Sequence, residues 1–155
     1  MKKLLSISAV LLGFIFLFIS CRSDDNDDAK TTIVGVWQPV TIKFSGVLNG
    51  QTLTQTITAN DCQKKSRSHF NSDGSGVNIV WSDDTGTCVQ SPDQNFTYTY
   101  NESTKTLAVT SGGSTQTGTI STLSNSQLVY SFTATHDFNG QNIPATVEIH
   151  ANRVN

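Results

Sequence analysis

Short segments in which apolar and polar residues alternate fill the chain from about residue 33 to its end, and turn signals separate them. Residue pairs that favour two-residue turns stand at Asn49-Gly50, Asp73-Gly74, Gly112-Gly113 and Asn139-Gly140. The runs between them are rich in Thr, Val, Ile and aromatic residues, as strands are. The expected strands cover 33–48, 51–59, 66–72, 75–82, 95–101, 106–111, 114–123, 127–138 and 141–154. Consecutive hairpins without a long crossover predict an all-β domain, an antiparallel up-and-down barrel of eight or nine strands.

The last hairpin can be paired from the sequence alone. With Asn139-Gly140 as a two-residue turn, one face of the hairpin takes the pairs Leu128–Ala151, Tyr130–Ile149, Phe132–Val147, Ala134–Ala145 and His136–Ile143. The other face is polar almost throughout, so the hydrophobic pattern and the turn agree on the register. The same reasoning pairs Tyr98 with Val109 and, across Asp73-Gly74, Phe70 with Val77.

The first strand contains a break in its alternation. Val40, Ile42 and Phe44 share one face, and strict alternation would turn Trp37 to the other. A β-bulge near Pro39 would return Trp37 to the interior, and we predict one there.

The N-terminus reads as a secretory signal. Lys2 and Lys3 precede an apolar run, Leu4 to Phe18, of about 15 residues, which is short for a membrane-spanning helix. The Phe18-Ile19-Ser20-Cys21 junction resembles a bacterial lipobox, in which the peptide is cut before the cysteine and the cysteine is lipidated. An uncleaved anchor and a stray thiol after an ordinary signal are the alternatives.

An acidic stretch, Ser23 to Asp28, follows directly and suits a solvated tether. A cysteine with acidic residues close behind it also resembles the export signal of Bacteroidota surface lipoproteins. The expected organisation is a signal peptide at 1–20, a tether at 21–32 and a barrel domain at 33–155. We expect the protein to be lipid-anchored in the outer membrane and exposed at the cell surface.

Charge and cysteine content narrow the function further. The expected domain has six basic and eight acidic residues, so it has no basic surface for nucleic acid. Cys62 and Cys88 would enter an oxidising compartment, and no other Cys or His stands at metal-ligand spacing from either. A disulfide is therefore predicted, contributing on the order of 3 kcal/mol.

Gly35-Val36-Trp37 at the start of the first strand and Arg153 near the end of the last one resemble the lipocalin superfamily. In that superfamily a Gly-x-Trp is covered by an arginine of the last strand, which implies a barrel-closing contact between Trp37 and Arg153. The ordered set Asp61 to Lys65, Phe70 to Gly76, Cys88 and Gly118 to Leu123 resembles more narrowly the lipocalin-like domain of Bacteroidota surface lipoproteins.

A candidate ligand site follows from this orientation. If Trp37 and Arg153 mark the closed end, the Asn139-Gly140 turn marks the mouth, and Ala134 opposite Ala145 would leave space inside. The candidate binding residues are Phe44, Tyr130, Phe132, Ala134, His136, Phe138, Ile143, Ala145 and Val147. An apolar pocket with one or two polar groups suits a small hydrophobic molecule. A filled core is the alternative.

The sequence leaves three functions to consider. A binding module would hold a small apolar molecule, whereas a structural or interaction module would present loops such as 82–95 to an envelope component. An enzyme is not expected, because His69, His136 and His150 form no motif with a nucleophile. Glu148 and His150 alone are too few ligands for a specific metal site, and no cofactor is expected.

Overall fold

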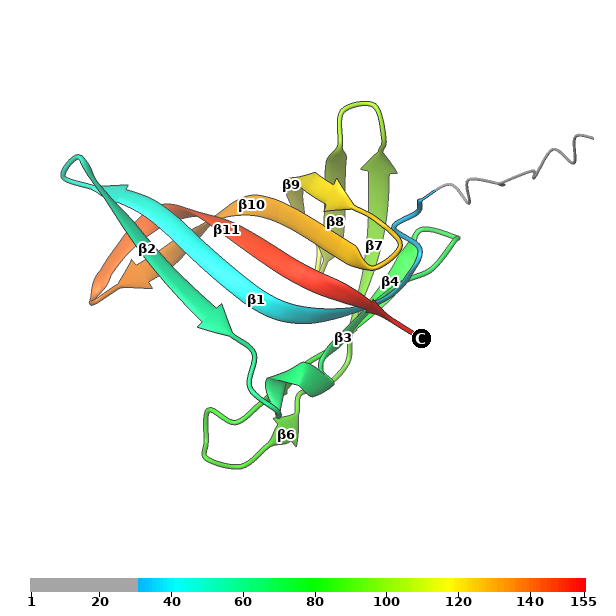
Figure 1. Cartoon of the computed structure of the whole chain (residues 1–155), viewed down its shortest axis with the longest axis horizontal. Coiled ribbons are helices and arrows are strands. Elements are labelled where there is room, and N and C mark those ends of the chain that lie inside the picture. Colours follow the sequence, from blue (N-terminus) through cyan, green and yellow to red (C-terminus); the bar gives the residue numbers. More distant parts are fainter. Residues whose placement is uncertain (1–30) are drawn as a thin grey trace, which may run out of the picture.

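The computed structural model describes residues 31–155, which fold almost entirely as antiparallel strands (Figure 1). The predicted signal peptide, Cys21 and most of the tether lie outside these residues. The elements are β1 (Gly35–Leu48), β2 (Gln51–Thr58), the 3₁₀ turn η1 (Gln63–Lys65), β3 (Arg67–Phe70), β4 (Ser75–Ile79), β5 (Trp81–Ser82), β6 (Val89–Gln90), β7 (Gln94–Asn101), β8 (Thr106–Ser111), β9 (Ser114–Leu123), β10 (Gln127–Phe138) and β11 (Gln141–Val154). No helix in this range is long and apolar enough to cross a membrane.

Eight of the strands close into a barrel. The sheet order is β11-β10-β9-β8-β7-β4-β3-β1-β2, and β1 also pairs with β11, from Val36 opposite Val154 to Gly46 opposite Ala145. The ring therefore runs from β1 through β3, β4 and β7–β11, and β2 lies outside it as a ninth strand on β1. The predicted all-β barrel is confirmed.

The closed end of the barrel is a filled core. Its buried residues come from nearly every strand of the ring: Ile33, Trp37, Phe70, Phe96, Leu107, Ile120, Leu128 and Ala151. Phe70 meets Phe96 and Tyr98 edge to face, with ring centroids 5.2 and 4.9 Å apart. A Cβ on Gly76 would lie 2.2 Å from the Phe96 ring, so only glycine lets that ring lie against β4.

The first and last strands are locked together at this end by Arg153. Its guanidinium lies 4.2 Å from the centroid of the Trp37 ring and donates hydrogen bonds to the carbonyl oxygens of Val34 (2.8 Å) and Thr32 (2.6 Å). The Trp37 indole in turn donates to the Ile33 carbonyl at 2.8 Å and is fully buried. The contact expected between Trp37 and Arg153 is present.

The predicted bulge in β1 is confirmed. The register with β11 shifts between Pro39, which faces Ala151, and Thr41, which faces His150. Trp37 before the shift and Ile42 after it consequently face the same interior. The pairing of β1 with β11 ends at Ala145, one residue short of Pro144, which has no amide to donate.

The hairpin registers were predicted with one error. All five pairs expected between β10 and β11 are present, and so is Tyr98 opposite Val109. The prediction that Phe70 pairs with Val77 is wrong, because Phe70 faces Gly76. Asn71 donates its amide to the Ser75 carbonyl at 2.9 Å, so the turn between them has three residues rather than two.

The predicted disulfide between Cys62 and Cys88 is confirmed. It joins the residue before η1 to the loop between β5 and β6, a two-stranded sheet that packs beside η1. The bond thus holds the Trp81 hairpin against the segment that connects β2 to β3.

Replacing Arg153 with methionine should lower the free energy of unfolding by about 2 to 4 kcal/mol, since it removes the contact with Trp37 and two hydrogen bonds to backbone carbonyls. Urea unfolding measures the change. Lys43→Met, at an exposed position of β1, is the matched control and should change stability by less than about 0.5 kcal/mol. Equal losses in the two variants would contradict the role given to Arg153.

Candidate functional site

At the open end, the β1–β2 and β10–β11 hairpins extend together beyond the ring (Figure 1). The nine candidate residues all lie on this side of the core, but they separate into groups. Phe44, His136 and Phe138 contact one another near the hairpin tips, and Tyr130 and Phe132 line a cavity inside the barrel. The remaining four are Ala134 and Ile143, paired with Ala145 and His136, and the buried Ala145 and Val147.

The outer group packs against itself. The Phe44 and His136 rings are stacked with centroids 3.7 Å apart, and the Phe138 ring meets His136 edge to face at 4.8 Å. Since β11 lies between β1 and β10, the stacked rings meet above it, and Ala145 beneath them is only 2% exposed. His136 Nε2 also lies 2.8 Å from Gln55 Oε1. The space expected at Ala145 is therefore filled by these rings.

Tyr130 and Phe132 line a cavity of about 220 Å³ inside the barrel. The other residues around it are Asn78, Leu107, Val109, Gln116, Gly118 and Ile149. Burial raises the pKa of the Tyr130 phenol from its ordinary value of 10.0 to about 12, so the group is neutral at physiological pH. Tyr130 can offer a ligand only its ring and a neutral hydroxyl.

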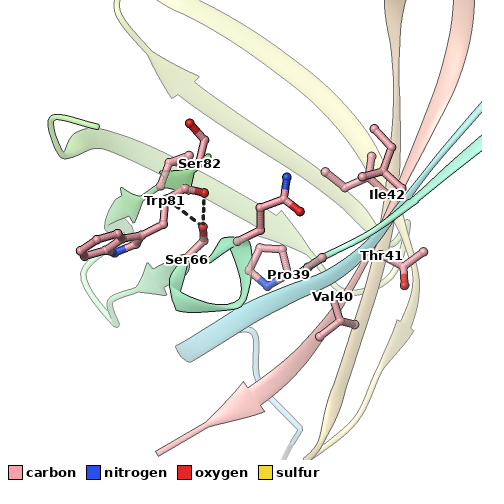
Figure 2. Close-up of a pocket in the computed structure, with 11 residues that line it drawn as sticks. Pro39, Val40, Thr41, Ile42, Ser66, Trp81 and Ser82 are labelled. Carbon is pink, nitrogen blue, oxygen red and sulfur yellow. Dashed lines mark hydrogen bonds between the residues drawn. The ribbon is translucent and has the colours of Figure 1, made fainter. Parts of the chain in front are cut away.

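A second cavity, of about 260 Å³, lies where β1 bulges. Its lining residues are Pro39, Val40, Thr41, Ile42, Ile57, Ala59, Gln63, Ser66, Val80, Trp81 and Ser82. Figure 2 shows the β1 residues on one side and Ser66, Trp81 and Ser82 on the other. The Ser66 hydroxyl accepts a hydrogen bond from the Trp81 amide at 3.0 Å, which leaves the wall largely apolar.

The two cavities adjoin each other. Ile42 lines the cavity at the bulge, and Ile149, its partner across the β1–β11 pairing, lines the inner one. Asn78 and Val80, on one segment, likewise line one cavity each. The Ile42–Ile149 pair therefore stands between the two cavities.

The sequence predicted two residues of the inner cavity, Tyr130 and Phe132, but did not predict the cavity at the bulge. The bulge cavity depends on the bulge in β1 and on the disulfide that holds the Trp81 segment near it. The β1 and Trp81 segments lie far apart in the sequence. A usable signal was the apolar run Ile79-Val80-Trp81, which ends β4 and begins β5 without a polar alternation.

The described residues contain no cluster of metal ligands. No group of three or more His, Cys, Asp or Glu within residues 31–155 could hold a metal ion. Glu148 and His150 lie 2.8 Å apart and bond to each other on the outer face.

The sequence matches a known protein family over most of the described residues. The family described as "Lipocalin-like domain" matches residues 33–130. Similar solved structures include bovine odorant-binding protein in complex with a selenium-containing odorant (16% identity, 78% of this chain and 69% of that chain, TM-score 0.44). A deswapped triple mutant of the same bovine protein (16%, 77% and 72%, TM-score 0.43) and the bovine lipocalin allergen Bos d 2 (15%, 81% and 74%, TM-score 0.41) are also similar. No curated protein matches the sequence.

The Tyr130 phenol should make stability fall with rising pH. Between pH 10 and about 12 the unfolded chain loses this proton while the folded chain keeps it, so the unfolded state binds fewer protons and the free energy of unfolding declines. Urea unfolding at pH 9 and pH 11 measures the decline, and Tyr130→Phe should make it shallower.

Tyr98 provides the comparison for this experiment. Its pKa is also raised, first by burial and then by the charge of Asp73, but its hydroxyl donates to the Asn71 carbonyl at 2.7 Å near the surface. Tyr98→Phe should change the pH dependence less than Tyr130→Phe does. An unchanged decline in the Tyr130 variant would show that its phenol is not buried.

Proposed function

Because the chain belongs to the lipocalin-like domain family, we propose that it binds a small, neutral, hydrophobic molecule in the two adjoining cavities. The protein is a binding module and not an enzyme. The bulge cavity is the entrance, and the cavity of Tyr130 and Phe132 is the inner end of the site.

The observation that carries this proposal is that no charged side chain lines either cavity, although Lys65 Nζ lies 5.0 Å from the centroid of the Trp81 ring. None of the residues that line them is Asp, Glu, Lys, Arg or His. A charged ligand would lose its hydration without gaining a partner, which is costly in an apolar environment. The few polar side chains, among them Gln63, Asn78 and Gln116, can orient one or two polar atoms of a neutral ligand.

Volume sets the size of the ligand. A cavity of about 150 Å³ is enough for benzene. The bulge cavity measures about 260 Å³ and the inner one about 220 Å³, so a molecule of up to about three rings, or a short alkyl chain, suits the pair.

A structural or interaction module is the second candidate. It is favoured by the packed core at the closed end and by the Phe44–His136 stack that fills the far end. On this reading the exposed positions of the loop 82–95 meet another envelope component, and the barrel has no ligand.

Titration with the fluorophore N-phenyl-1-naphthylamine separates the two candidates. The wild-type protein should enhance the emission of the dye saturably, because the dye is apolar and has two aromatic parts. Ile42→Trp should weaken binding by about tenfold or more, since the larger ring would occupy the bulge cavity that Ile42 lines.

Val47→Trp is the matched control. Val47 lies on the same strand and is 64% exposed, so the added ring enters solvent and dye binding should equal that of the wild type. If both variants and the wild type bind the dye equally, the dye binds elsewhere. If none binds it saturably, the structural module is favoured.

The lipid anchor belongs to the same proposal. We infer that Cys21 carries the lipid, that the acidic stretch behind it directs export, and that the protein stands on the outer face of the outer membrane. An apolar binder in that place would collect or hold small hydrophobic molecules outside the cell.

Metabolic labelling with a radioactive fatty acid tests the anchor. The full chain should incorporate the label and sediment with membranes, whereas Cys21→Ser should do neither. Replacing Asp24, Asp25, Asp27 and Asp28 with asparagine should keep the label but remove the sensitivity of the protein to protease added to whole cells. Label retained in Cys21→Ser would overturn the assignment.

A further inference from the structure

The outer edge of β2 has no partner strand in residues 31–155. β2 pairs only with β1, from Thr41 opposite Thr58 to Leu48 opposite Gln51, and it stands last in the sheet order. Seven of its eight residues are exposed, Leu53 being the exception. Figure 1 shows the strand at the margin of the molecule, apart from β3.

The backbone groups that this edge presents can be identified. The Ala59 amide donates to the Val40 carbonyl at 2.9 Å, in the same register as the β1–β2 ladder. Hydrogen-bonded pairs alternate along an antiparallel ladder, so the odd-numbered residues of β2 bond to β1. The amides and carbonyls of Thr52, Thr54, Thr56 and Thr58 therefore point outwards.

Nothing on β2 protects this edge from pairing. Natural edge strands are usually guarded by charged residues, proline or a bulge. β2 has none of these, since its sequence is Gln-Thr-Leu-Thr-Gln-Thr-Ile-Thr and its register with β1 is unbroken. The free edge of β10 differs, because it carries the charged Asp137.

The sequence of β2 is symmetric about Gln55. Reading outwards from it gives Thr54 and Thr56, then Leu53 and Ile57, then Thr52 and Thr58. An antiparallel copy of the same strand, centred on Gln55, would place like beside like at each position. Thr–Thr pairs and apolar pairs of this kind stabilise antiparallel sheets.

We propose that two copies of this protein dimerise by pairing their β2 strands around a two-fold axis at Gln55. Thr54 and Thr56 of one copy exchange backbone hydrogen bonds with Thr56 and Thr54 of the other, and Thr52 pairs likewise with Thr58. Leu53 meets Ile57 of the second copy on the inner face, which covers part of the 39% exposed Ile57 side chain. The sheet β10-β11-β1-β2 then continues from one copy into the next.

This arrangement brings no like charges together. β2 has no charged residue, and the nearest charge on β1 is Lys43, opposite Thr56. The two-fold symmetry makes the contact isologous, so the assembly closes at two copies.

Oxidative cross-linking tests the register. Directly opposed residues of a non-hydrogen-bonded pair have Cα atoms about 4.5 Å apart, within the range of a disulfide. In the full chain in mild detergent, with Cys21→Ser to remove that thiol, Gln55→Cys should give a covalent dimer on a non-reducing gel. Gln51→Cys is the matched control: it is exposed on the same face of the same strand, but its two copies would lie about 26 Å apart. Equal cross-linking of both variants, or none in either, would overturn the proposal.

A pair of variants that differ at one residue supplies a second test, which does not depend on a thiol. Thr54→Glu with Thr56→Glu sets like charges opposite each other in the dimer, whereas Thr54→Lys with Thr56→Glu sets opposite charges there. Both keep a glutamate beside Lys43. Sedimentation velocity of the full chain should show dimerisation weakened about tenfold or more in the first variant and restored in the second. Dimerisation that is the same in both variants, or that is absent from the wild type, would refute β2 pairing, and thermal unfolding checks that each variant is folded.

Discussion

The closure of the barrel depends on one contact, between Arg153 and Trp37. The guanidinium covers the indole face and binds two carbonyl oxygens of the chain just before β1, so the first and last strands are fixed over a distance of more than 110 residues in sequence. Gly35 is part of this contact, because a Cβ there would lie 2.2 Å from the arginine Nη1 and its φ is +140°. The Arg153 guanidinium therefore explains both residues of this motif: it packs on the Trp37 ring, and it leaves no room for a Cβ at position 35.

Closure at this end also fixes the position of the two cavities. The core around Trp37 fills the closed end of the barrel with aromatic rings, and the bulge cavity lies beyond it, where β1 continues as Ile42. There the Phe44–His136 stack fills the space over Ala145. What remains between core and stack is the region of Ile42 and Ile149, and both cavities lie against this pair.

Much of this fold could be predicted from local chemistry, and the errors have physical reasons. Asn139-Gly140 allows a two-residue turn with one register, so the pairing of β10 with β11 followed directly. Asp73-Gly74 suits a two-residue and a three-residue turn alike, and the structure has the longer one. The shift sets Gly76 opposite Phe70, which is what makes room for Phe96. The bulge cavity was not foreseen, because three distant segments build it and no periodicity links them.

The bulge in β1 explains both the 260 Å³ cavity and the free edge of β2. On the side away from β11, β1 pairs with β3 only from Gly35 to Trp37 and with β2 only from Thr41 onwards. The change of partner falls at the bulge, where the strand bends and its register shifts. β2 consequently follows the part of β1 after the bulge, while β3 follows the part before it. The sheet therefore has a gap between β2 and β3. The disulfide-held segment of η1 and Trp81 covers this opening incompletely, which leaves the 260 Å³ cavity, and β2 is left without β3 as a neighbour. A barrel in which β1 kept one register throughout would close this gap, and it would have neither the apolar entrance nor a strand free to pair.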